Sequence, residues 1–189
     1  MKKQLAFIFS FLLLTLFVFA QEKKVYVNFS SEGIKFSFPF GKKYNYADIK
    51  VKRVIDGDTL ELENGQRVRL IGIDAPEMHE SPKLLRDAYR SKQDIKVIKA
   101  MGRRSWEFLK KMVEGKSVRL EFDIEKYDRY NRLLAYVFLK EDNTFINAKM
   151  LSEGYAQIMT ITPNVKYADY FLGLYRKARE EKKGLWSKP

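Results

Sequence analysis

Three carboxylates and one arginine lie close together in the first half of the chain, and their residue types suit phosphoester chemistry. They are Asp58, Arg69, Asp74 and Glu77. Two carboxylates can hold a hard cation such as Ca²⁺ or Mg²⁺, a third can orient or deprotonate water, and a guanidinium binds phosphate through paired hydrogen bonds. The spacing indicates a metal-assisted phosphate site, although an Asp-Gly-Asp sequence such as residues 56–58 is more often only a turn.

A second charged stretch, residues 127–133, places two arginines beside a tyrosine at the entrance to a predicted strand. Arg129, Tyr130 and Arg132 would suit a polyanion whose bases can stack on an aromatic ring. An exposed arginine pair is more often only solvated, so neither charged stretch is specific by itself.

Composition narrows the chemistry that the chain can perform. It has 189 residues, no cysteine and a single histidine, His79. This excludes disulfide frameworks, thiolate metal sites, a cysteine nucleophile and multi-histidine metal centres. A loop histidine such as His79 is usually solvated, and we do not assign it as a catalytic base.

The net charge of +12 is concentrated in two segments. Residues 80–116 carry 11 basic and 5 acidic side chains, and residues 164–189 carry 7 and 3. A basic surface attracts phosphate polymers, so we expect nucleic-acid binding that weakens as ionic strength rises. The alternative is a solvated surface that serves only solubility.

The first 20 residues have the pattern of a secretory signal peptide. Lys2 and Lys3 precede an apolar run over residues 5–20, and residues 18–20 resemble a cleavage site. Because the run is short for a spanning helix, we expect cleavage, no stable membrane association afterwards, and a secreted, periplasmic or cell-envelope product. An uncleaved segment that holds the chain at the cell surface is the alternative.

Periodicity predicts an N-terminal extension followed by one α+β domain. Residues 25–29 and 34–38 alternate, which suggests a β-hairpin within an extension over residues 21–45. Residues 46–189 are predicted to form an OB-fold, a five-stranded Greek-key β-barrel with three α-helices. The predicted strands are 49–55, 59–63, 66–73, 118–122 and 133–139, and the predicted helices are 95–113, 145–153 and 167–183.

The dipeptide Asn64-Gly65 predicts the hairpin that brings the charged residues together. If it forms a two-residue turn, Leu60 lies opposite Arg69. The same register gathers Asp58, Arg69 and Asp74 at one end of the hairpin.

Five separated strings resemble the thermonuclease family, also described as staphylococcal nuclease-like. The resemblance covers roughly residues 46–187 in the family's order, and it implies an OB-type barrel with three helices. The strings are VIDGDT (54–59), VRLIGIDAPE (68–77), DRYNRLLAY (128–136), LSEGYA (151–156) and GLWS (184–187).

This resemblance implies a calcium site and a residue that acts on water. Asp58 and Asp74 match the family's calcium-binding aspartates. Ala75 stands where a threonine's backbone carbonyl is a ligand, and a carbonyl ligand survives that change. Glu77 matches the glutamate that activates or positions the attacking water.

The resemblance also implies residues that contact the substrate. Arg69 and Arg132 match the two arginines that clamp the scissile phosphate. Tyr130 matches a tyrosine near the bound nucleotide, and Arg129 stands where a lysine contacts a terminal phosphate. The implied protein is a Ca²⁺-dependent nuclease acting on DNA or RNA with 3′-phosphate products, and we expect it to be a monomer.

The chain departs from the family pattern in two places. Residues 158–163 carry threonines where the family has nucleotide-binding tyrosines, which alters the expected base stacking. The connection after Glu77 is longer and basic, and we expect residues 82–90 to form an extra helical turn or two beside the site. Its charge favours a role in holding substrate, and the alternative is that it only lengthens a loop. A nucleic-acid-binding module without activity is the rival interpretation, but the complete charged set favours an enzyme.

Overall fold

The computed structural model describes residues 24–31, 34–42 and 44–187, in two units divided after Tyr44. In the first unit, β1 (Lys24–Ser31) and β2 (Ile34–Lys42) pair antiparallel. The predicted signal peptide lies outside the described residues, so its cleavage and the chain divisions at residues 20 and 45 remain predictions. Within the described ranges, no helix is both long enough and apolar enough to cross a membrane.

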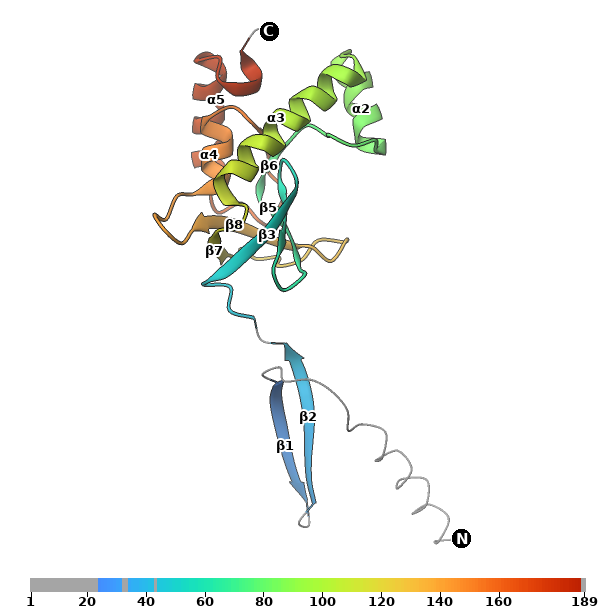
Figure 1. The fold of residues 1–189 in the computed structure, drawn as a ribbon, viewed down its shortest axis with the longest axis vertical. Helices are drawn as coiled ribbons and strands as arrows, with labels where there is room; N and C mark the ends of the chain where they lie inside the picture. Colours follow the sequence, from blue (N-terminus) through green and yellow to red (C-terminus); the bar gives the residue numbers. More distant parts are fainter. Residues whose placement is uncertain (1–23, 32–33, 43, 188–189) are drawn as a thin grey trace. The chain divides into compact units, whose positions relative to one another are not determined.

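Five strands of the second unit close into a barrel, which confirms the predicted fold class (Figure 1). Around the barrel they run β3 (Ile49–Asp56), β4 (Thr59–Leu62), β5 (Arg67–Leu70), β8 (Leu133–Leu139) and β7 (Ser117–Glu121). β5 and β8 pair in parallel, whereas the other neighbours pair antiparallel. Their alternating apolar side chains fill the interior, where residues such as Val51, Leu60 and Val68 are fully buried.

The register of the β4–β5 hairpin differs from the predicted one by one residue. Thr59, rather than Leu60, lies opposite Arg69. Gly65 donates its N–H to the Leu62 carbonyl at 2.9 Å and takes a left-handed φ of +82°. These are features of a three-residue hairpin loop, so the predicted two-residue turn was wrong. Arg69 nevertheless reaches the same end of the hairpin.

The predicted strand over residues 66–73 is broken at Ile71, just before Gly72. Gly72 has a φ of +81°, and a Cβ atom there would lie 2.6 Å from the ring of Phe171. The chain therefore leaves the barrel and continues as β6 (Gly72–Asp74), which pairs with β9 (Gln157–Met159). The sequence pattern predicted neither this break nor the separate two-stranded sheet.

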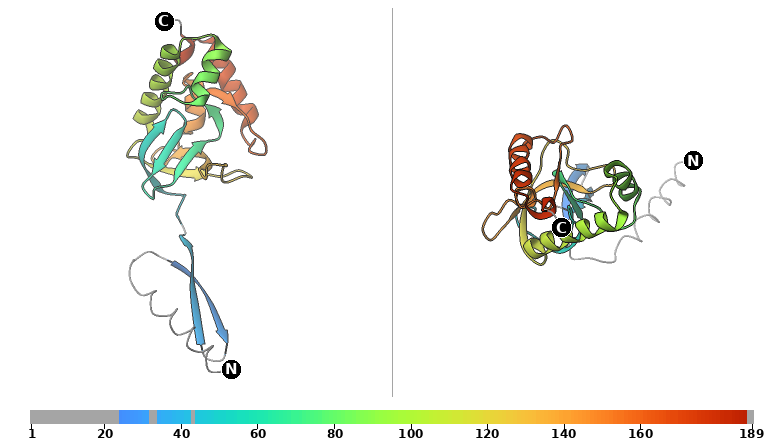
Figure 2. Two further views of the ribbon diagram at one scale, coloured as in Figure 1. Left: turned by 90° about the vertical axis from the view of Figure 1, so that its right-hand side faces the viewer. Right: turned by 90° about the horizontal axis from the view of Figure 1, so that it is seen from above.

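In the described part of the second unit, four helices accompany the barrel, one more than predicted. They are α2 (Pro82–Ser91), α3 (Ile95–Val113), α4 (Ile146–Ser152) and α5 (Ala168–Glu180), followed by the short 3₁₀ turn η1 (Gly184–Trp186). Figures 1 and 2 show the helices gathered at one end of the barrel. The bounds of α3 agree with the prediction because its apolar periodicity and the following Gly115 mark both ends.

The additional helix is α2, a full ten-residue helix where we expected only an extra turn or two. Ser81 caps it by accepting the Leu84 N–H, and Pro82 occupies the first turn. Leu84 is its one buried residue, and the helix packs against α3 of the same unit.

Candidate functional site

Arg69 lies between two aspartates at the end of the β4–β5 hairpin. Its guanidinium contacts the carboxylate of Asp58 and donates to Oδ1 of Asp74 at 2.8 Å. Burial lowers the pKa of Arg69 below its ordinary value, and the ion pair with Asp74 opposes that effect. The hairpin thus places one guanidinium against both predicted metal-binding aspartates.

Asp58 is almost fully buried in the turn between β3 and β4. Its Oδ1 accepts the hydroxyl of Thr59 and its Oδ2 accepts the backbone N–H of Ala75, both at 2.9 Å. Gly57 makes this approach possible, because a Cβ atom there would lie 2.5 Å from the Cβ of Ala75. Asp58 therefore ties its turn to the segment after β6, and protein donors already engage both of its oxygens.

A cationic side chain that the sequence analysis did not single out lies in the middle of the predicted site. Nζ of Lys83, on α2, is 3.0 Å from Oδ1 of Asp74, 3.0 Å from Oε1 of Glu77 and 2.9 Å from the carbonyl of Ala75. The available signal was the Ser81-Pro82 cap, which begins a helix and thereby places Lys83 in its first turn.

The converging oxygens fit a hard cation. Carboxylate and carbonyl oxygens of Asp74, Ala75 and Glu77 surround one position, and Ca²⁺ takes oxygen ligands of these kinds. Over residues 44–187, no three Asp, Glu or His side chains form a metal-binding group of their own. The converging set consists of the main-chain oxygen of Ala75 and the carboxylates of Asp74 and Glu77. Asp58 lies next to this set, because it accepts a hydrogen bond from the Ala75 N–H.

Glu77 is positioned by α3 and by the N-terminus of α2. A Cβ atom at Gly102 would lie 2.6 Å from the carbonyl carbon of Glu77, so glycine lets α3 pass directly against this backbone. The Ser81 hydroxyl lies 3.4 Å from the second carboxylate oxygen of Glu77. The carboxylate is therefore held on one side by Lys83 and on the other by Ser81.

A fourth carboxylate, Asp56, lies near these groups and entered the sequence analysis only as part of a motif. Burial raises its pKa, the hydrogen bond from the Gly57 N–H lowers it, and the charge of Glu77 raises it further. Its position at the end of β3, in the Asp-Gly-Asp turn, was the signal that could have identified it.

Arg132 is held by the loop that precedes β8. Asp128 accepts the backbone N–H groups of Tyr130 and Arg132 at 2.9 and 3.0 Å, and Nε of Arg132 at 2.7 Å. Burial alone would raise the pKa of Asp128, but the hydrogen bonds from Arg132 hold it below its ordinary value. Because β5 and β8 are neighbours, Arg132 is close enough to Arg69 for its charge to lower the pKa of Arg69, after the larger effect of burial.

The two predicted nucleotide-contacting residues lie on the same loop. Tyr130 is 66% exposed, and Arg129 and Arg132 place their guanidinium carbons 5.0 and 5.4 Å from its ring centroid. This arrangement presents an aromatic face with two cations to the solvent, as binding of a nucleotide would require.

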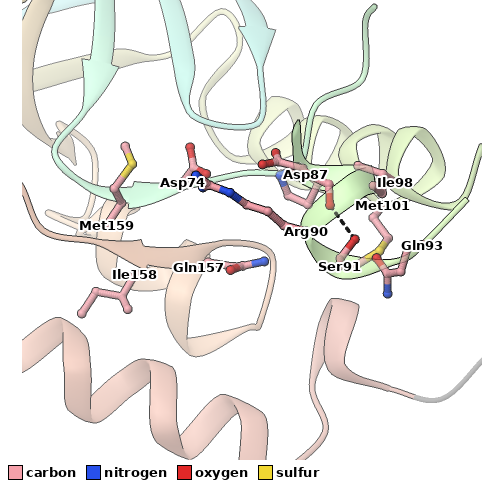
Figure 3. Close-up of a pocket in the computed structure, with 11 residues that line it drawn as sticks. Asp74, Asp87, Arg90, Ser91, Gln93, Ile98, Met101, Gln157, Ile158 and Met159 are labelled. Atoms are coloured by element: carbon pink, nitrogen blue, oxygen red, sulfur yellow. Dashed lines mark hydrogen bonds between the residues drawn. The ribbon is translucent and has the colours of Figure 1, made fainter. Parts of the chain in front are cut away.

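A pocket of about 430 Å³ opens beside Asp74 (Figure 3). Arg90 of α2 and Met101 of α3 line one side, and Gln157 and Met159 of β9 line the other. Its volume is in the range of small-ligand sites. The segment after residue 156 thus contributes a strand and a pocket wall.

Residues 67–188 match the family described as "Staphylococcal nuclease homologue". A thermonuclease of Staphylococcus hyicus is 31% identical over 85% of this chain and 88% of its own length. A thermonuclease of Staphylococcus intermedius is 35% identical over 73% and 75%, and an uncharacterized protein of Methanocaldococcus jannaschii is 37% identical over 73% and 70%. The matched region contains all the predicted site residues except Asp58, which precedes it.

Proposed function

This chain belongs to the staphylococcal nuclease family, and from that membership we propose that it is a Ca²⁺-dependent nuclease that hydrolyses phosphodiester bonds of DNA or RNA. Relatives named thermonuclease support nucleic-acid hydrolysis. The observation that carries the proposal is the convergence of oxygens of Asp74, Ala75 and Glu77 on one position, with Arg69 bonded to Asp74 beside it.

Asp74 and the carbonyl of Ala75 would hold Ca²⁺, with Asp58 beside them. When bound, Ca²⁺ supplies Lewis-acid stabilisation of charge on the phosphate. Glu77 orients or deprotonates a water molecule for in-line attack on phosphorus. In the described part of the chain the carboxylate of Glu77 is contacted by the side chains of Lys83 and Ser81, and it stays 18% exposed, so water can reach it.

Arg69 and Arg132 would hold the equatorial oxygens of the phosphate as negative charge grows on them. Water adds to phosphorus and the bond to the 5′-oxygen breaks, so the phosphate stays on the 3′-oxygen of the other product. Arg132 donates a hydrogen bond to the departing 5′-oxygen. Tyr130 and Arg129 contact the adjoining nucleotide from their exposed loop.

Removal of Ca²⁺ tests this proposal directly. We expect the purified protein to degrade single-stranded DNA with added Ca²⁺, to lose at least about 100-fold of its rate in chelator, and to recover when Ca²⁺ is restored. RNA digested in parallel establishes the preferred polymer. Full activity in chelator would remove Ca²⁺ from the mechanism while leaving nuclease activity in place.

We also propose that the protein acts outside the cytoplasm after residues 1–20 are removed. The pattern of a cationic start and a short apolar run supports this. N-terminal sequencing of the exported protein should begin just after Ala20. An exported or surface-held product that still begins at Met1 would contradict cleavage and favour the anchored alternative.

A further inference from the structure

The ammonium of Lys83 occupies the point at which the oxygens of Asp74, Ala75 and Glu77 converge. Its three contacts, at 2.9 to 3.0 Å, are hydrogen-bonding distances for an ammonium. Ca²⁺ held by Asp74 and the Ala75 carbonyl would draw those two oxygens to about 2.3–2.6 Å. One set of oxygens cannot satisfy both cations at once.

The charges of the cluster lead to the same conclusion. Three carboxylates, Asp58, Asp74 and Glu77, already have two cationic partners, Arg69 and Lys83. A divalent ion added beside both cations would be repelled by them, and this repulsion is strong where water is partly excluded.

Lys83 is the cation that can leave. The side chain of Arg69 is only 12% exposed and is bonded on two sides, whereas that of Lys83 is 25% exposed and has a flexible four-carbon stem. Its helix is lightly attached, because Leu84 is the one buried residue of α2, while Leu85 and Tyr89 are 62% and 88% exposed. The pocket of Figure 3 leaves space beside the same helix.

We propose that Lys83 is a tethered cation that fills the Ca²⁺ position of the resting protein and competes with the metal for it. When Ca²⁺ binds, Lys83 withdraws, and the carboxylate of Glu77 is released to act on water. Lys83 thereby sets the Ca²⁺ concentration at which the site becomes active. This inference rests on the proposed Ca²⁺ dependence and adds that metal binding and release of Glu77 are a single event.

The test compares Lys83→Met, which keeps an unbranched side chain one heavy atom shorter and removes its charge, with the wild-type full chain. Calorimetric titration with Ca²⁺ should give a dissociation constant at least about tenfold lower for the variant, because a site without its competitor is always available. Arg86→Met is the matched control. Arg86 lies on the exposed face of the same helix, so this variant has the same net charge and should bind Ca²⁺ like the wild type.

Thermal unfolding in chelator supplies a second measurement. Lys83→Met should unfold at a lower temperature than Arg86→Met, because Asp74 and Glu77 lose their shared counter-ion, and added Ca²⁺ should remove this difference. If Lys83→Met does not fold, Lys83→Gln, which retains a hydrogen-bond donor, undergoes the same two measurements.

The other outcomes separate this inference from the proposed function. Equal Ca²⁺ affinity in Lys83→Met and wild type overturns competition and leaves a Ca²⁺-dependent nuclease intact. Weaker affinity in the variant overturns it in favour of a lysine that assembles the ligands. Absence of Ca²⁺ binding in both proteins overturns the metal site and competition together. Cleavage in chelator that Lys83→Met abolishes would mean that the ammonium replaces the metal.

Discussion

Arg69→Met and Arg132→Met should each lower the turnover of a nucleic-acid substrate by about 10²–10³-fold, the effect of removing one preorganised donor to a developing negative charge. The two guanidinium groups lie at the neighbouring strands β5 and β8, and Arg132 is close enough to affect the pKa of Arg69. Loss of either arginine leaves the equatorial oxygens of the phosphate with one guanidinium partner instead of two. Rates measured at saturating substrate and Ca²⁺ separate this effect from weaker binding.

The two variants should differ in stability. Arg69→Met leaves the buried Asp58 and the partly buried Asp74 without their guanidinium, which should cost about 3–5 kcal/mol of unfolding free energy. Arg132 pairs with Asp128, to which two backbone N–H groups would still donate after the substitution, so its loss should cost less, about 1–3 kcal/mol. Urea denaturation measures both values.

Arg67→Met is the matched control for this prediction. Arg67 lies on the same strand, two residues from Arg69, but is exposed, so its replacement should leave turnover unchanged. A folded Arg132→Met enzyme with wild-type turnover would show that the assignment of a phosphate clamp is wrong.

Glu77→Gln should lower turnover by about 10²–10⁴-fold, the range for loss of a positioned general base. The amide has the shape of the carboxylate but cannot accept a proton from water at neutral pH. Single-turnover rates at saturating Ca²⁺ are the appropriate measurement, because the variant also removes one negative charge from the cation position.

Glu80→Gln serves as the control for Glu77→Gln. Glu80 lies three residues further along the same connection, its side chain is 90% exposed, and its nearest cation is Lys99 at 3.8 Å. This variant should keep the wild-type rate. If Glu77→Gln stays within tenfold of wild type, another group handles the water, and the partly buried Asp56 is the next residue to replace.

Much of the fold could be predicted because it depends on local patterns. Strand β8 and helix α3 have the predicted bounds, since alternation over seven residues and helical periodicity over nineteen are long, unambiguous signals. Strand β9 has three residues and could not be predicted, because it is a strand only by virtue of its pairing with β6.

The β4–β5 hairpin could be predicted only in part. Its Asn64-Gly65 dipeptide correctly predicted a turn, but the same dipeptide is compatible with a two-residue and a three-residue loop. The left-handed conformation of Gly65 selects the longer loop and moves Arg69 opposite Thr59. The choice between two registers that differ by one residue depends on the pairing of the whole strands.

The sequence by itself determined the types and order of the charged residues. These were enough to indicate the family, and the comparisons then established it. Arg69, Asp74, Ala75 and Glu77 lie within nine residues, so the local turn structure already brings them close together.

Only the tertiary structure distinguished Lys83 from the other basic residues of its segment. Spacing along the chain did not reveal that its ammonium meets Asp74, Ala75 and Glu77, because that contact depends on a helix folding back over the site. Local hydrogen bonding and apolar periodicity are encoded in neighbouring residues. Which side chain supplies the counter-ion at a cation position depends on how separate helices and strands pack together.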